Sequence, residues 1–342
     1  MTVAWSRALT VFAALACATV AGAQGDLPGD PATTSFAFAV VGSAVAGGTG
    51  GEADRGTVPL LRAIDGSDAR FAVHFDLSAA SAASCSDASL ARRRALLDAS
   101  AKPVVPVAAA AEWAHCGQAA GDPLERLEHL GDVLFAGDES PGQARLSWVR
   151  QSSVPRFRRY RENLRWQVGP VLFATINLPD NNNNFRLGAG RNGEFEERLV
   201  ANRAWLDRTF RLASERRLAG IVVFVDAAPR FSAPLRAPDL RAHERDGFYE
   251  WKVALRDFVP AFKGQVLLVQ ARYAAGLSRP PGVDQPLEDA QGRTIANFSR
   301  IALAEGADLR WMRIDVDPQS RKVFRVSAER IFDDPSGELY GR

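Results

Sequence analysis

The sequence predicts an α/β fold, in a single domain built largely on parallel strands. Short apolar runs alternate along most of the chain with longer segments whose apolar residues recur at helical spacing. This alternation is typical of units in which a helix connects two parallel strands. Near the end of the chain, strand candidates follow one another without helices, which predicts an additional antiparallel portion. Since no linker divides the 342 residues, we expect one domain over residues 35–335.

The expected strands are short runs of apolar and β-branched residues bounded by polar or glycine-containing segments. The first run, FAFAVVG, is apolar throughout, as in a strand that is buried on both faces. The strands that alternate with helices cover residues 36–42, 70–77, 103–107, 171–177, 220–226 and 265–270. The final candidates cover residues 295–304, 308–317 and 322–330.

The expected helices carry apolar residues three or four positions apart. They cover residues 58–64, 87–100, 123–135, 194–217 and 248–262. Ser86 is the expected N-cap of the second helix, along which Leu90, Arg94 and Leu97 recur. The fourth helix has the clearest apolar stripe.

Two polar segments lie between these elements. Residues 137–170 are expected to form an irregular arm, whose arginine-rich part, 150–166, would pair with acids on the surface. Residues 180–193 are expected to form a loop, and this loop contains four consecutive asparagines, 181–184.

The amino terminus is typical of a secretory signal peptide. Arg7 precedes an apolar run over residues 8–20, and the small residues Ala21, Gly22 and Ala23 follow it. We therefore expect cleavage after Ala23, a tether over residues 24–34 and a periplasmic or secreted protein. The run is too short for a transmembrane helix. Lipoprotein anchoring through Cys17 is a second, less favoured interpretation.

Charge and cysteine content limit the classes of partner. Removal of residues 1–23 takes one Arg from the 42 basic residues, which leaves 41 against 40 acidic residues. This balance gives no reason to expect nucleic acid as a partner. Two cysteines remain, and in an oxidising compartment they predict a disulfide between Cys85 and Cys116. A metal site is the rival interpretation, which the absence of a C-x-x-C motif disfavours.

Several segments give the chain a family resemblance. These are EWAHC, DPLERL, YRENLRWQVGPVLFATINLPDNNNN, ANRAWLDRTF and LRWMRIDVDP, in that order along the chain. They resemble an exported bacterial branch of the calcineurin-like metallophosphoesterases. The resemblance implies two mixed β-sheets packed face to face and flanked by helices. It also implies a phosphoesterase site in which two divalent metal ions hold the attacking water and the phosphate oxygens.

The chain departs from this family at the loops where the resemblance places the metal ligands. Gly42-Ser43 and Asp76-Leu77 stand where the pattern has Gly-Asp, and an alanine run stands where it has an asparagine-containing element. The degenerate positions are Ser43, Leu77, Ala110, Ala111, Gln270 and Ala274. Because alanine and leucine side chains offer no lone pairs, we expect no bound metal ion and no other cofactor.

Some polar residues remain near these positions. A residual polar site would use Asp76, Glu112, His115, Asn177 and Asp226. The favoured interpretation treats His74 as a core histidine and the other polar residues as solvated loop groups. The sequence thus predicts a pseudoenzyme that binds a small molecule or an envelope protein. The alternative is an active phosphoesterase or other hydrolase with a rebuilt metal site.

Overall fold

The computed structural model describes residues 34–43, 52–78, 85–116, 122–186, 192–229, 231, 246–271, 287–289, 291–303, 310–333 and 339–341. The predicted signal peptide and Ala274 lie outside these residues. Across the described ranges, no helix is long and apolar enough to cross a membrane.

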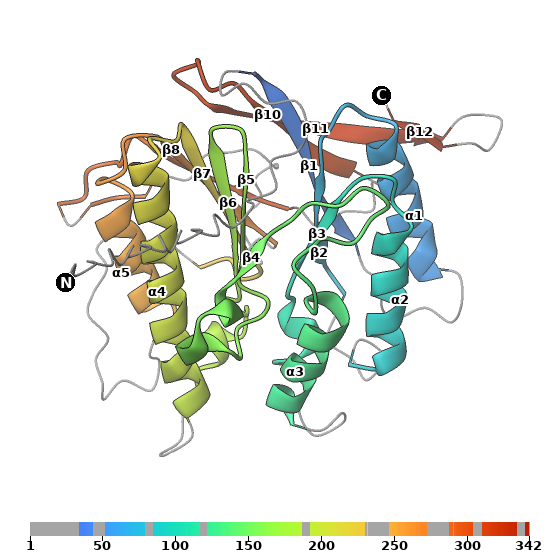
Figure 1. Ribbon diagram of the computed structural model, residues 1–342, viewed down its shortest axis with the longest axis horizontal. Helices are drawn as coiled ribbons and strands as arrows, with labels where there is room; N and C mark the ends of the chain where they lie inside the picture. Colours follow the sequence, from blue (N-terminus) through green and yellow to red (C-terminus); the bar gives the residue numbers. More distant parts are fainter. Residues whose placement is uncertain are drawn as a thin grey trace, which may run out of the picture.

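Two mixed β-sheets form the centre of the molecule (Figure 1), and in the described part of the chain each has six strands. The first sheet has the order β12 (Leu339–Gly341), β11 (Phe324–Asp333), β10 (Arg310–Val316), β1 (Phe36–Ser43), β2 (Ala72–Asp76) and β3 (Val104–Val107). The second has the order β4 (Val149–Arg150), β5 (Leu164–Val168), β6 (Val171–Ile176), β7 (Gly220–Val225), β8 (Gln265–Gln270) and β9 (Phe298–Ala302).

Each sheet combines a parallel group of strands with an antiparallel one. β1, β2 and β3 run parallel, and so do β6, β7, β8 and β9. β10 pairs antiparallel with β1, and β5 pairs antiparallel with β6. The carboxyl ends of the parallel strands therefore gather at one edge of each sheet, which is where α/β proteins place their sites.

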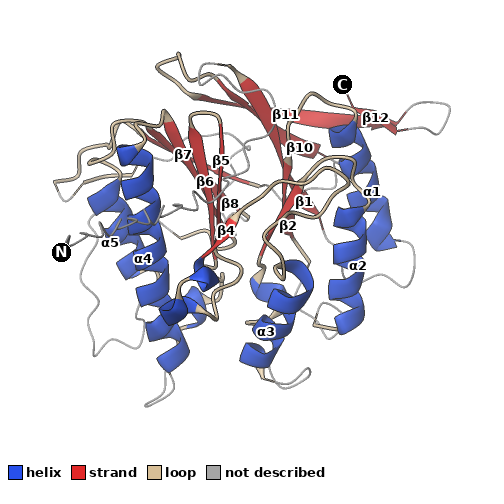
Figure 2. Ribbon diagram, in the orientation of Figure 1, coloured by secondary structure: helices blue, strands red, loops and turns tan. Residues whose placement is uncertain are grey.

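Helices cover the outer faces of both sheets, so the fold has four layers (Figure 2). The apolar faces of α1 (Glu52–Asp65) and α2 (Asp87–Asp98) pack on the first sheet. Those of α4 (Gly193–Glu215) and α5 (Tyr249–Phe258) pack on the second. α3 (Pro123–Leu134) lies beside α2. The predicted fold class, two packed mixed sheets flanked by helices, is confirmed.

Aromatic side chains hold the two sheets face to face. Phe38 of β1 lies edge-on to Phe173 of β6, with 5.2 Å between the ring centroids. Trp166 of β5 stacks on both Phe173 and Phe224, at 5.4 and 5.9 Å. These rings are almost fully buried, and such pairs contribute about 0.5–1.5 kcal/mol each beyond the burial of their area.

The last strands of the chain are divided between the two sheets. β9 joins the second sheet parallel to β8, while β10 and β11 extend the first sheet beside β1. The predicted antiparallel portion is therefore present in β10 and β11, and only β9, among the strands expected there, runs parallel to its neighbour. The predicted irregular arm also contains β4 and β5. β5 was missed because buried and half-exposed residues alternate along it, which interrupts its apolar run.

Candidate functional site

The carboxyl ends of strands from both sheets meet at one edge of the molecule. Ser43 at the end of β1 lies opposite Asp76 at the end of β2. Asn177 and Asp226 directly follow β6 and β7, which run parallel in register. The main-chain N–H of Ala110, in the loop after β3, donates a 2.7 Å hydrogen bond to Oδ2 of Asp226. This bond joins the strand ends of the two sheets and locates the candidate site.

Four buried alanines form the loop after β3. Residues 108–111 are each at most 4% exposed, and the last two begin a short 3-10 helix, η1 (Ala110–Glu112). The main-chain oxygen of Ala110 accepts the N–H of His115 at 3.0 Å, which keeps the loop compact. Because methyl groups cannot coordinate a cation, the alanines offer the site only main-chain atoms.

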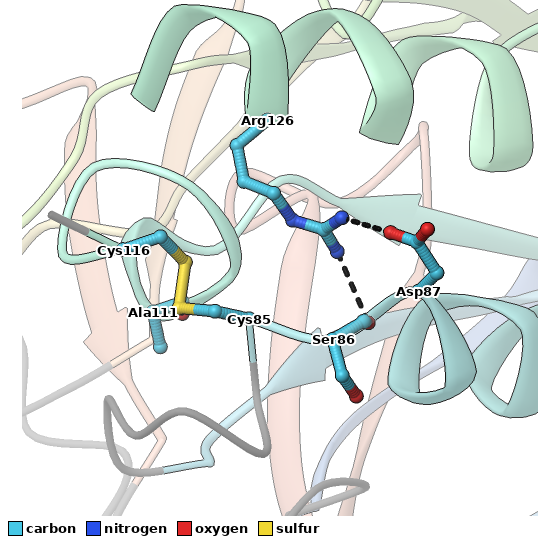
Figure 3. The surroundings of a disulfide bond; sticks show 6 residues. All are labelled: Cys85, Ser86, Asp87, Ala111, Cys116 and Arg126. Carbon is cyan, nitrogen blue, oxygen red and sulfur yellow. Dashed lines mark hydrogen bonds and ion pairs between the residues drawn. A yellow bond between two sulfur atoms is a disulfide. The ribbon is translucent and has the colours of Figure 1, made fainter. Parts of the chain in front are cut away.

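The predicted disulfide between Cys85 and Cys116 is confirmed, and it lies against the alanine loop (Figure 3). The two sulfur atoms lie 3.6 and 3.4 Å from the carbonyl oxygen of Ala111. Beside the bridge, Arg126 of α3 donates a 3.0 Å hydrogen bond to the main-chain oxygen of Ser86. The bridge therefore ties the start of α2 to the loop that follows β3.

A buried ion pair lies behind the alanine loop. Nη1 of Arg93, from α2, lies 2.5 Å from Oε2 of Glu112, and both side chains are at most 2% exposed. Nη2 of Arg93 donates to the main-chain oxygens of His74 and Val107 at 3.1 and 3.0 Å. Burial raises the pKa of Glu112, and the Arg93 charge opposes that rise. The guanidinium thus connects the middle of β2 and the end of β3 to η1.

Ser43 forms part of a small buried hydrogen-bonded group. Its Oγ lies 2.8 Å from Oγ1 of Thr57 and 2.9 Å from Nε2 of His74. Burial, reinforced by the charge of Arg93, holds the pKa of His74 well below its usual range. His74 is therefore a neutral core histidine, in agreement with the favoured interpretation of this residue.

The two residues at the end of β2 have different surroundings. Oδ1 of Asp76 accepts hydrogen bonds from the N–H, at 2.8 Å, and the hydroxyl of Ser78. Leu77 packs against the core between the sheets. A Cβ on Gly42 would lie 2.6 Å from Cδ1 of Leu77, so a larger residue at this position of β1 would displace the end of the Leu77 side chain.

Asn177 belongs to a network of buried amides. Its Nδ2 donates to Oε1 of Glu162 at 2.8 Å, and its N–H donates to Oδ1 of Asn163 at 2.7 Å. Asn202 of α4 donates to the main-chain oxygen of Asn177 at 2.9 Å. Burial raises the pKa of Glu162, which the hydrogen bond from Asn177 partly offsets. The network anchors the end of β6 to α4.

The asparagine run has an unusual backbone conformation. Asn182, Asn183 and Asn184 have φ angles of 55°, 57° and 54°, in the left-handed region that asparagine tolerates better than most residues. The N–H of Gly247 donates to Oδ1 of Asn182 at 2.8 Å, and Nδ2 of Asn183 donates to the oxygen of Gly247 at 2.9 Å. The turn is therefore attached to the segment before α5.

Arg198 of α4 holds this turn from the inside. It donates to Oδ1 and to the main-chain oxygen of Asn183, at 2.6 and 2.9 Å, and it pairs with Glu194 at 2.6 Å. Its guanidinium carbon lies 5.4 Å from the centroid of the Trp113 ring. Arg198 thus links the asparagine turn to the loop that follows β3.

The expectation that the polar residues of this edge are solvated loop groups is wrong for four of them, which are at most 4% exposed because they bond to protein groups: Asp76, Glu112, Asn177 and Asp226. In addition to the contacts above, Nε2 of His115 lies 3.0 Å from Oδ1 of Asp180. Gln270, at the end of β8, donates to the main-chain oxygen of Ala227 at 3.1 Å. Among the described residues, no group of three or more His, Cys, Asp or Glu side chains is arranged to hold a metal ion.

Three charged residues of the site were missed by the sequence analysis. Arg93, Arg198 and Glu162 are almost fully buried. For Arg93 a signal was present, because it lies three residues after Leu90 and four before Leu97. The apolar stripe of α2 therefore contains Arg93 rather than the predicted Arg94. Charged residues in an apolar helical stripe are the signal that identifies such groups.

No model of a known protein family matches the chain, and no curated protein matches it. Among solved structures, the chain is similar to one described as "GAP50 the anchor in the inner membrane complex of Plasmodium". The identity is 10% and the TM-score 0.42, over 90% of this chain and 88% of that chain. A similarity at this level carries no argument, so the fold rests on the strand order and packing described above.

Proposed function

We propose that this protein is a non-catalytic relative of the calcineurin-like metallophosphoesterases, exported from the cytoplasm, that binds a ligand at the carboxyl ends of its strands. The observation that carries this proposal is the buried contact between Arg93 and Glu112. Glu112 is a carboxylate next to the alanine loop, and it is already paired with the guanidinium of Arg93. Because that guanidinium is itself a cation, it takes the place that a metal ion would need.

The residues at this edge do not fit a pair of divalent metal ions. Two such ions lie about 3.5–4 Å apart, and they require several carboxylate and imidazole ligands with free lone pairs. Here Leu77 packs into the core, Ala110 and Ala111 carry only methyl groups, and Glu112 is held by Arg93. The residues that the structure describes at this edge therefore support no metal-dependent step.

Two polar atoms support the binding of a polar ligand here. Nε1 of Trp113 and Oδ1 of Asn177 are buried and have no hydrogen-bonding partner in the described part of the chain. Leaving such an atom unsatisfied costs about 1–3 kcal/mol. A ligand or water that accepts from the indole and donates to the amide oxygen would remove that cost. The half-exposed pair of His115 and Asp180 adds a charged group at the same edge.

The disulfide supports the export part of the proposal. Disulfides persist in oxidising compartments and are rare in the cytosol of most organisms. The bridge between Cys85 and Cys116 agrees with the periplasmic or secreted location that was expected from the amino-terminal sequence.

The test of this proposal measures metal content and turnover together. The purified protein would be incubated with manganese, iron and zinc in turn, freed of excess metal and analysed for bound metal. Turnover of p-nitrophenyl phosphate and of its bis-ester would be measured in the same samples. We expect no stoichiometric metal and no turnover above the buffer. About two equivalents of metal with metal-dependent turnover would contradict the proposal.

If turnover is observed, two matched variants show whether it comes from a rebuilt site in this protein. Asp226→Asn removes a carboxylate at the site, whereas Asp257→Asn removes one that is half-exposed on α5 and pairs with Arg203. Activity that depends on Asp226 but not on Asp257 would establish the alternative function. Activity that neither substitution changes would indicate a contaminating enzyme.

A further inference from the structure

A pocket of about 540 Å³ lies at the opposite end of the second sheet from the candidate site. Three segments form its walls: the end of α4, the loop between α5 and β8, and the turn between β10 and β11. Figure 1 shows β10 and β11 at the top of the molecule and α3 at the bottom. The pocket is within the usual range for small-molecule sites, which is about 300–1,000 Å³.

The charged residues that line this pocket are all cations. Arg217, Lys263 and Arg321 come one from each wall, and no Asp or Glu is among the lining residues. Glu215 and Asp317 are close in sequence but do not line the pocket. Each of the three walls thus contributes one positive charge to this pocket.

These three cations make no side-chain ion pair or hydrogen bond with any residue that the structure describes. Many other arginines of the chain are paired, including Arg93, Arg198 and the exposed Arg211. All three are exposed residues, so their donors are accessible to a bound anion from three sides of the pocket.

The position of Arg217 is unusual for its residue type. It follows the end of α4 with φ at 52°, a position where glycine is the common residue. The negative end of the helix dipole favours a cation there. That effect does not account for Lys263 or Arg321, which come from other segments.

The loop that carries Lys263 is firmly held. Nδ2 of Asn297 lies 2.9, 2.8 and 3.0 Å from the main-chain oxygens of Val259, Phe262 and Gly264. A Cβ on Gly264 would lie 2.5 Å from the oxygen of Ala219, so the loop presses directly on the wall formed by α4. The pocket is therefore preformed, which lowers the entropic cost of binding.

We propose that this pocket binds a small organic phosphate that carries at least two negative charges. Three cations match such an anion, and the buried side chains of Leu218, Phe262 and Val323 provide an apolar base for its carbon skeleton. The pocket is separate from the strand-end edge, so binding here does not depend on the proposed function.

Isothermal titration calorimetry of the full-length protein with pyrophosphate and with fructose 1,6-bisphosphate tests the inference. We expect saturable binding of both at one site, no binding of glucose, and affinity that falls as salt is raised. Arg217→Gly and Arg321→Ser should each weaken binding about tenfold or more, because each removes a charge-assisted contact. Since glycine readily adopts positive φ, Arg217→Gly should leave the fold intact.

Lys322→Ser is the matched control, because Lys322 is an exposed cation in the same turn as Arg321 but does not line the pocket. It should change affinity less than about twofold, as expected for a screened surface charge. Equal weakening by all three variants, or no saturable binding of either phosphate, would overturn the inference. Binding only to phosphatidylglycerol vesicles, and to neither soluble phosphate, would also overturn it.

Discussion

At the scale of single residues, the pair of Arg93 and Glu112 determines the character of the strand-end edge. Burial removes both charged side chains from water, which has a desolvation cost. The attraction between the two charges offsets this cost only if their remaining polar atoms also form hydrogen bonds. The carbonyls of His74 and Val107 satisfy part of the guanidinium. We therefore expect that removing one member of the pair lowers the stability of the fold more than removing both, because a single removal leaves an unpaired buried charge.

Arg93→Met is expected to cost about 3–5 kcal/mol in the free energy of unfolding, because it leaves a buried carboxylate without its partner. The double variant with Glu112→Leu should cost only about 1–2 kcal/mol, mainly for the two carbonyls that lose a donor. Urea unfolding at neutral pH measures both values. Arg94→Met, at the half-exposed neighbouring position, is the control. Equal losses for the single and double variants would show that an unpaired Glu112 adds no cost to the folded state.

Arg217→Gly is expected to raise the free energy of unfolding by about 0.5–1 kcal/mol. Glycine removes the strain of a left-handed residue, which costs roughly 1–2 kcal/mol, but gains freedom in the unfolded chain. Arg216→Gly should instead be destabilising, because Arg216 has φ at −82°. Thermal unfolding of the two variants in phosphate-free buffer compares them. A loss of stability for Arg217→Gly would contradict the assignment of strain to this residue.

At the scale of elements, the asparagine turn shows what the sequence could not predict. A polar loop was expected over residues 180–193, and that expectation agrees with the short turn observed at Asn182–Asn184. Its left-handed backbone was not predicted, because it depends on Arg198 and Gly247, which are far away in the sequence. Local sequence indicates which residues tolerate a conformation, whereas distant contacts select it.

Arg198→Met is expected to destabilise the protein by about 3 kcal/mol and to loosen the asparagine turn. The substitution leaves two oxygens of Asn183 without their donor and leaves Glu194 with the hydrogen bond from Asn184 but no cation. Hydrogen exchange measured by mass spectrometry should quicken in residues 178–186 and stay unchanged in β10 and β11. Arg211→Met, on the exposed face of α4, should cost within about 0.5 kcal/mol. Unchanged exchange in the turn would refute the anchoring role of Arg198.

The predicted elements were most accurate where a strand is buried on both faces. β8 matched the prediction over Gln265–Gln270, and Ser86 caps α2 by accepting the N–H of Ser89 at 3.2 Å. α1 begins at Glu52, earlier than predicted. The prediction missed its first turns because they are polar and contain a glycine. Strands with one half-exposed face, such as β5, gave a weaker signal.

At the scale of the whole molecule, the two-sheet arrangement explains why the site residues were only partly predictable. The chain order indicates which residues follow a strand, so Asp76, Asn177 and Asp226 were identified as neighbours of strand ends. Asp76 bonds to the nearby Ser78, but the partners of Asn177 and Asp226 come from the arm, from a helix and from the other sheet. Ala110 meets Asp226 across 116 positions of sequence, a separation that no local pattern can reveal.

Glu162→Gln should alter the dependence of stability on pH. Burial raises the pKa of Glu162 in the folded protein above its ordinary value of about 4.3. The unfolded chain therefore ionises first as pH rises, and the wild type loses stability through the window up to the raised pKa. Glutamine does not titrate, so the variant does not lose this stability. The free energy of unfolding of the variant minus that of the wild type should therefore be more positive at pH 7.5 than at pH 5.

Urea unfolding at both pH values measures this difference. Glu197→Gln is the control, since Glu197 is an exposed carboxylate on α4. A stabilising effect of Glu162→Gln that is larger at pH 5 than at pH 7.5 would contradict a raised pKa for Glu162. Equal effects of the two substitutions would show that burial of Glu162 has no influence on its titration.

The sulfur bridge also has a mechanical consequence. A force applied to the two ends of the oxidised chain cannot extend the 31-residue separation between Cys85 and Cys116, because tension passes through the bridge. In single-molecule stretching, the oxidised protein should release about 100 Å less contour length than the reduced one. The segment between the two cysteines contains α2 and β3. This segment would stay a closed covalent loop while the rest of the chain is extended.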